Sequence, residues 1–204
     1  MNYLDATLIF HNDKITYVGN PWEGIEGAED LPEQEKELEV MMDWEAPIME
    51  RSAEFVCENG GDILEIGFGM GIASDFIQSH SPASHTIIEL HPQIAERART
   101  WAAGKSNVTI LEGDWIDILP TLGTFDGIFY DAYGTMGHWG EVAETMGGHT
   151  ISGCHITFWN CCRGERNGCG FDNSYNISYE QMEVNPPQNT YFNDKVYFFP
   201  KVVM

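Results

Sequence analysis

Hydrophobic and polar positions along the chain predict short strands separated by helices. The expected strands are apolar runs that begin at residue 62 and recur at 86–89, 107–111, 125–130 and 150–158. Helical periods lie between them, at about 70–80, 92–103, 115–119 and 138–146. This alternation predicts an α/β fold, in which helices cover both faces of a mostly parallel sheet.

The N-terminal part has a different pattern. Residues 6–10 and 14–18 alternate around a polar tripeptide, which predicts a β-hairpin. A segment rich in Gly and Glu follows at 19–33, and a helical period runs from about 33 to 58. We therefore expect a hairpin and an acidic segment, the latter as a candidate lid over a ligand.

The C-terminal part begins with a turn-forming, cysteine-rich stretch at 160–174. Strands are expected near 175–184 and 194–203, as an antiparallel pair that closes the sheet. We divide the chain into the N-terminal hairpin with its acidic segment, 1–40, and the α/β domain, 41–204.

The first strand ends in three glycines at alternate positions, Gly67, Gly69 and Gly71. Because glycine has no side chain, a ligand can approach the backbone closely where a strand turns into a helix. The spacing G-x-G-x-G differs from the G-x-G-x-x-G of nicotinamide and flavin binders, and it favours S-adenosylmethionine. The alternative is an ordinary strand-to-helix turn without a ligand.

Acidic residues accompany the ends of the predicted strands. Glu89 lies 24 residues after Glu65, close to the roughly 20 residues at which such folds place a carboxylate on ribose hydroxyls. Asp114 and Trp115 follow the third strand, where they could accept from an adenine amino group and cover its face. Asp131 follows the fourth strand. The ends of parallel strands share one edge of a sheet, so these residues form one candidate ligand site.

Charge and composition restrict the partners. The 204 residues carry 10 Lys and Arg against 32 Asp and Glu, a net charge of −22, which argues against nucleic acid because phosphate binding needs basic residues. A negative field suits a cationic substrate, but on charge alone a solubilising surface is the better explanation. No apolar run approaches the ~20 residues of a membrane span, and no secretory signal is evident, so we expect a cytoplasmic protein without a membrane partner.

Five cysteines indicate a reducing compartment. Four of them fall between residues 154 and 169, but their spacing matches no zinc ligand pair, so no metal is expected.

Four stretches together are more specific than any single motif: Val40–Met49, Leu64–Gly71, Phe125–Tyr133 and Tyr197–Pro200. Their order resembles class I S-adenosylmethionine-dependent methyltransferases, and within them guanidinoacetate N-methyltransferase and the protein-arginine δ-N-methyltransferases. The resemblance implies a Rossmann-like sheet with a reduced C-terminal half and an antiparallel closing hairpin.

The resemblance also implies roles for single residues. Glu45 and Asp131 would clamp the guanidino group, Asp131 taking the proton of the reacting nitrogen and Glu45 orienting the opposite edge. Met41 and Met49 flank Glu45 and are expected beside the cofactor, with a place in the core as the alternative.

Substrate contacts are implied for three further residues. Tyr133 belongs to a Tyr-Asp-x-Tyr segment, and Ile156 and Thr157 match a segment whose backbone binds the substrate carboxylate in guanidinoacetate N-methyltransferase.

The resulting function is an S-adenosylmethionine-dependent guanidino N-methyltransferase, with a small cationic acceptor such as guanidinoacetate. A protein-arginine (δ-N) methyltransferase and a non-catalytic cofactor-binding module are the alternatives. The reduced C-terminal half would leave one face of the sheet thinly covered, so a homodimer is also expected.

Overall fold

The computed structural model describes residues 3–19, 36–133, 139–160 and 175–204. Its main sheet has seven strands in the order β6-β5-β4-β7-β8-β10-β9. In chain order these are β4 (Asp62–Ile66), β5 (Ser84–Glu89), β6 (Val108–Glu112), β7 (Phe125–Tyr130), β8 (Thr150–Phe158), β9 (Ile177–Glu183) and β10 (Val196–Val203). Strands β4 to β8 pair in parallel, whereas β10 runs antiparallel to both β8 and β9. The predicted α/β fold and its closing hairpin are therefore confirmed.

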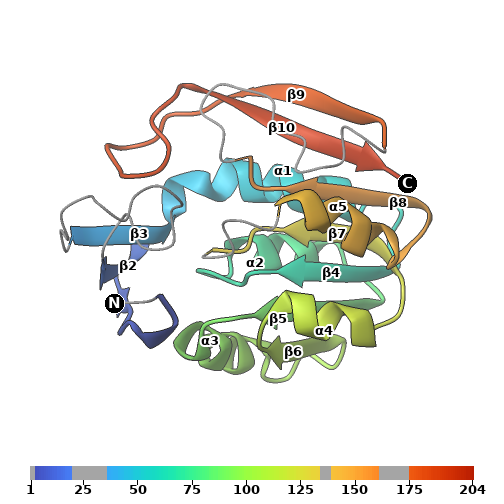
Figure 1. Ribbon diagram of the computed structural model, residues 1–204, viewed down its shortest axis with the longest axis horizontal. Coiled ribbons are helices and arrows are strands. Elements are labelled where there is room, and N and C mark those ends of the chain that lie inside the picture. The colour runs from blue at the N-terminus through green and yellow to red at the C-terminus, as the bar shows by residue number, and fades with distance from the viewer. Residues whose placement is uncertain (1–2, 20–35, 134–138, 161–174) are drawn as a thin grey trace.

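Two layers of helices cover this sheet (Figure 1). The helices are α1 (Ala46–Val56), α2 (Ile72–Ser79), α3 (Pro92–Ala102), α4 (Trp115–Ile118) and α5 (Trp139–Gly147), with 3-10 turns at Tyr3–Asp5, Asp43–Glu45 and Leu119–Thr121. One buried cluster joins α4 and α5 to the sheet, and a second joins α1 and α2 to it. No helix among the described residues is long and apolar enough to cross a membrane.

A smaller antiparallel sheet contains β1 (Ile9–Phe10), β2 (Lys14–Gly19) and β3 (Lys36–Met42). The expected hairpin is present in shortened form, since β1 pairs only through its two residues with β2. In Figure 1 this sheet stands beyond the ends of the parallel strands, at the edge where the ligand site was predicted.

The predicted helix over 33–58 is wrong in its first part. Residues 36–42 form β3, because they pair with β2 along its whole length, and the helix starts only at Ala46. Pro47 explains this start: proline lacks an N–H and fits the first helical turn but interrupts a helix that precedes it. The predicted domain boundary at 40/41 falls within β3 and stays a prediction.

Two predicted features lie outside the described residues. They are the acidic segment, of which 20–35 is not described, and most of the cysteine-rich stretch, 161–174.

Candidate functional site

The glycine turn after β4 joins the ends of three neighbouring strands. The amide of Gly67 donates to the carbonyl of Ile88 at the end of β5, and the amide of Asp131 after β7 donates to Ile66, both at 2.8 Å. Gly67 has φ +93°, and a Cβ atom there would lie 2.1 Å from the carbonyl oxygen of Asp131. Only glycine permits this close approach, which places Asp131 beside the turn.

Met41 of β3 lies against the same turn. Its Sδ atom accepts a hydrogen bond from the amide of Met70 at 3.1 Å, and a Cβ on Gly69 would meet that sulfur at 2.5 Å. Met41 thus lies at the turn where the cofactor is expected. Met41 and Met49 are both buried in the same cluster, which fits the alternative of a place in the core, and their contact with the cofactor stays a prediction.

The carboxylate of Glu89 accepts hydrogen bonds from the glycine turn and from the residue that precedes α3. Its carboxylate accepts from the amides of Phe68 and His91, each at 2.8 Å, and it is 4% exposed. Burial raises the pKa of this carboxyl group, and the backbone donors oppose that effect. Its contact with ribose stays a prediction.

Glu65 is buried under the first turn of α2. One carboxylate oxygen accepts from Ser74 Oγ at 2.6 Å and lies 2.9 Å from His85 Nε2. The other oxygen, Oε1, is buried and has no hydrogen-bond partner among the described residues. A buried acceptor of this kind is costly unless a ligand or water satisfies it.

Asp114 and Trp115 stand at the start of α4. Asp114 caps this helix, accepting from the amide of Ile116 at 3.0 Å. The indole of Trp115 is only 2% exposed and packs edge-on against Tyr130 at 5.4 Å. The ring is therefore part of the core, and its contact with adenine stays a prediction.

Glu45 ends the 3-10 turn before α1 and is 3% exposed. Its Oε1 atom accepts from the amide of Met42 at 2.8 Å and from the hydroxyl of Tyr191 at 2.6 Å. The second oxygen has no hydrogen-bond partner among the described residues. Burial raises the pKa of Glu45 to about 8, and the negative charge of Asp131 adds to this shift.

Asp131, partly buried after β7, is the other acid of this pair. Burial raises its pKa to about 7, with further contributions from the charges of Glu65 and Glu89. Its carboxylate accepts no hydrogen bond from the residues that the structure describes. The fold thus brings two predicted catalytic acids close enough for their charges to interact, and it leaves acceptor oxygens on both.

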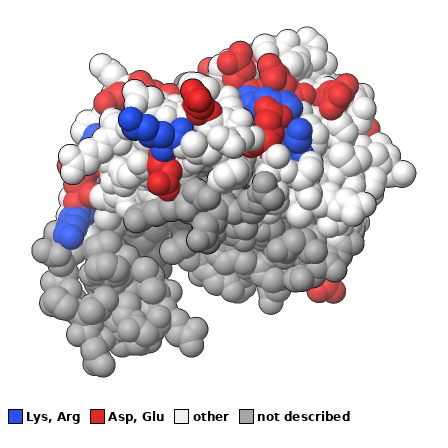
Figure 2. Space-filling view, turned by 90° about the horizontal axis from the view of Figure 1, so that it is seen from above, with Lys and Arg blue, Asp and Glu red and all other residues white. Residues whose placement is uncertain are grey.

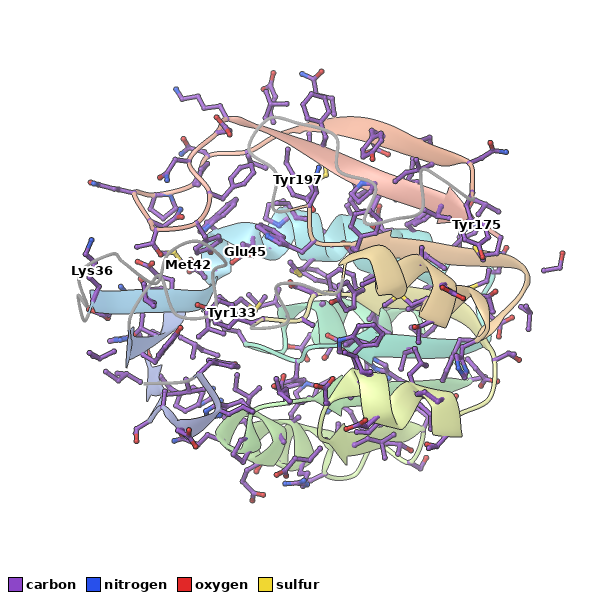
Figure 3. The ribbon with its side chains drawn as sticks, viewed as in Figure 1. Lys36, Met42, Glu45, Tyr133, Tyr175 and Tyr197 are labelled. Atoms are coloured by element: carbon purple, nitrogen blue, oxygen red, sulfur yellow. The ribbon has the colours of Figure 1, made fainter. Side chains whose placement is uncertain are left out.

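Tyr133 lies at the same end of the main sheet as Glu45 and Met42 (Figure 3). Its ring packs 4.8 Å from that of Tyr3, and its hydroxyl donates to Tyr17 at 3.4 Å. Burial raises the pKa of its hydroxyl. These contacts tie it to the N-terminal sheet, and its contact with substrate stays a prediction.

Ile156 and Thr157 lie inside β8 and are fully buried. Ile156 belongs to the core, and the Thr157 hydroxyl donates to the carbonyl of Pro200 at 2.7 Å. Their side chains are thus occupied, and both residues are paired within the sheet, Ile156 with β7 and β10 and Thr157 with β7. Their contact with a substrate stays a prediction.

Sequence reasoning missed Tyr191, which donates to Glu45 and accepts from the indole of Trp44 at 3.2 Å. It comes from the connection between β9 and β10, and no motif marked it. Trp44 stacks on Tyr191 and Phe192, which completes an aromatic wall beside Glu45.

Residues 22–142 match the family described as guanidinoacetate N-methyltransferase. The chain belongs to this family. Its cofactor is therefore S-adenosylmethionine, as the glycine turn predicted, and it is classed as an S-adenosylmethionine-dependent methyltransferase. The unpartnered, buried Glu65 oxygen fits such a cofactor, which carries a cationic amino group.

Curated relatives named protein arginine N-methyltransferase 2 are similar to the chain. The protein of Aspergillus oryzae is 40% identical over 137 residues, which cover 64% of this chain and 29% of that protein. The protein of Saccharomyces cerevisiae is 31% identical over 198 residues, which cover 80% of this chain and 47% of that protein. The chain thus spans less than half the length of these relatives.

Solved structures support the fold. Spermidine synthase from Thermotoga maritima aligns with a TM-score of 0.67 at 11% identity, over 97% of this chain and 72% of that one. Precorrin-6y C5,15-methyltransferase from Geobacter metallireducens aligns with a TM-score of 0.59 at 15% identity, over 77% of this chain and 86% of that one.

Proposed function

We propose that the chain transfers a methyl group from S-adenosylmethionine to the guanidino group of an arginine side chain in a protein. The pair of acids, Glu45 and Asp131, beside the glycine turn is the observation that carries this proposal. The names of the curated relatives favour a protein acceptor. The family description favours a second candidate, the small molecule guanidinoacetate.

The two carboxylates suit a guanidinium ion. This cation is planar and presents N–H donors on two edges, which carboxylates accept in pairs. The Met42 amide and the Tyr191 hydroxyl hold one oxygen of Glu45. Its other oxygen is thereby fixed in place to accept a hydrogen bond from the guanidino group. We assign Glu45 to orient one edge of the guanidino group and Asp131 to the reacting nitrogen.

The cofactor residues are assigned from the same geometry. Glu65 and Glu89 would hold the amino-acid part and the ribose, with Met41 packed on the glycine turn. Asp114 and the backbone of Trp115 would meet the adenine. When bound, S-adenosylmethionine supplies a methyl group on a positively charged sulfur, and the electrons of the broken C–S bond stay on that sulfur.

We assign the removal of the proton to a side chain of the protein. A guanidinium ion is a poor nucleophile because its pKa is above about 12 and its charge is delocalised. As the C–N bond forms, the nitrogen must lose a proton, and Asp131 accepts it. A carboxylate whose pKa is raised to about 7 is a stronger base than an ordinary aspartate.

The charge of the molecule agrees with a cationic acceptor. In Figure 2, acidic side chains spread over the described part of the upper face, and basic ones form only small groups next to them. Such a field concentrates cations near the surface.

A transfer assay with labelled S-adenosylmethionine tests this function. The acceptors are an arginine-containing peptide, the same peptide with lysine in place of arginine, and guanidinoacetate. Label in the arginine peptide alone supports the proposal, and label in guanidinoacetate alone supports the second candidate. Absence of transfer to all three, with cofactor binding intact, would instead indicate a non-catalytic module.

A further inference from the structure

A cleft of about 590 Å³ lies between the start of α1 and the end of β9. Its walls combine apolar and acidic residues, and no Lys or Arg is among them: they are Asp43, Trp44, Pro47, Glu183, Val184 and Asn185. Trp44, Pro47 and Val184 give it an apolar surface, and Asp43 and Glu183 are exposed at its rim.

The two rim acids are available to a cation. Within the described parts of the chain, neither Asp43 nor Glu183 forms an ion pair. Glu180, on the same strand as Glu183, instead pairs with Arg51 at 2.9 Å and with Lys201 at 3.2 Å. Arg51 and Lys201 are thus engaged by Glu180 and not by the two rim acids.

The cleft shares a wall with the catalytic pair. Trp44 lines it and donates through its indole N–H to Tyr191, whose hydroxyl donates to Glu45. Trp44 also precedes Glu45 in the sequence. A polypeptide whose arginine reaches Glu45 therefore has its neighbouring residues next to this cleft, because one residue of extended chain spans about 3.5 Å.

We propose that this cleft binds a second basic side chain of the protein substrate, an Arg or Lys within a few residues of the arginine that is methylated. The inference rests on the proposed function and adds a preference for sequence around the target. The ammonium or guanidinium group lies between Asp43 and Glu183, and its aliphatic stem covers Trp44, Pro47 and Val184. The indole of Trp44 adds attraction for the cation.

Two peptides of equal length separate this site from the catalytic pair. One has a single arginine, and the other has the same arginine with lysine two residues away. The double variant D43N/E183Q removes both rim charges with little change of shape. The matched control is E50Q, because Glu50 is an exposed acid of α1 that does not line the cleft.

We expect D43N/E183Q to raise KM for the dibasic peptide about 5- to 10-fold at low salt, since each partly exposed ion pair contributes up to about 1 kcal/mol. kcat for that peptide and both constants for the single-arginine peptide stay at the wild-type value. E50Q behaves as wild type with both peptides.

Equal KM values for D43N/E183Q and E50Q on the dibasic peptide would overturn the cleft proposal and leave the proposed function standing. Failure of the wild type to methylate either peptide, with guanidinoacetate methylated, would overturn the proposed function itself, and the cleft proposal with it.

Discussion

Replacing Glu45 with glutamine isolates the cost of burying this acid. The side-chain oxygen of glutamine can still accept from the Met42 amide and the Tyr191 hydroxyl, so the hydrogen bonds seen at Oε1 are retained. What the substitution removes is the ionisable group and its repulsion with Asp131.

The sign of the effect follows from the direction of the pKa shift. The pKa of Glu45 rises from 4.5 in the unfolded chain to about 8 in the folded protein. Below pH 4.5 both states hold the proton and the group has no effect on stability. As the pH rises from 4.5 towards 8 the unfolded state loses the proton first, so the folded state is progressively destabilised.

Between the unfolded-state pKa of 4.5 and pH 7 the folded state loses about 3 kcal/mol of stability, because each pH unit in this range is worth about 1.4 kcal/mol. At pH 5 the loss is below about 1 kcal/mol. The E45Q variant escapes this loss. Its free energy of unfolding relative to wild type is therefore expected to rise by about 2 to 3 kcal/mol between pH 5 and pH 7.

Urea unfolding of wild type and E45Q at pH 5, 6 and 7 measures this difference. E50Q, which changes an exposed acid on the helix that follows Glu45, serves as the control and should show no such trend. If the advantage of E45Q is the same at pH 5 and pH 7 to within about 0.5 kcal/mol, Glu45 is not a buried acid with a raised pKa, and the reasoning fails.

Four further outcomes are expected. D131N should keep cofactor affinity and lose at least about 100-fold in kcat, as measured by label transfer, because it cannot accept the proton; turnover at the wild-type rate contradicts that role. Y191F should lower kcat/KM about fivefold and move the rising limb of its pH profile to higher pH. The hydrogen bond from Tyr191 lowers the pKa of Glu45 in the wild type, so its removal raises that pKa; an unshifted profile argues against the contact. G67A should cost at least about 3 kcal/mol in urea unfolding, against about 1 kcal/mol for G60A, which has a positive φ but open space around it; equal losses would show that the approach to Asp131 is unimportant. Light scattering should give twice the chain mass of 23.0 kDa, and a monomer mass would refute the homodimer.

The parallel sheet could be predicted because its signals are local. Strands β4 to β7 are apolar runs that end in or directly before glycine or an acid, and the sheet edge then follows from topology alone. For this reason the sequence led to Glu89, Asp131 and the glycine turn, all of which meet at that edge in the structure.

Strand β3 was missed because its pairing is not local. Its polar residues suit a helix surface equally well, and only the partner strand β2, across an intervening segment, decides for a strand. Tyr191 was missed for the same reason, since it reaches Glu45 from 146 positions away. Met41 and Met49 flank Glu45 in the sequence, and both lie in one buried cluster, where Met41 also contacts the glycine turn.

The central claim is that Glu45 and Asp131 together hold a guanidinium group. Calorimetric titration of an arginine peptide into protein saturated with S-adenosylhomocysteine tests it most directly. We predict that E45Q and D131N each weaken peptide binding at least about 10-fold while their affinity for S-adenosylhomocysteine is unchanged. Peptide binding as tight as that of the wild type in both variants would contradict the account.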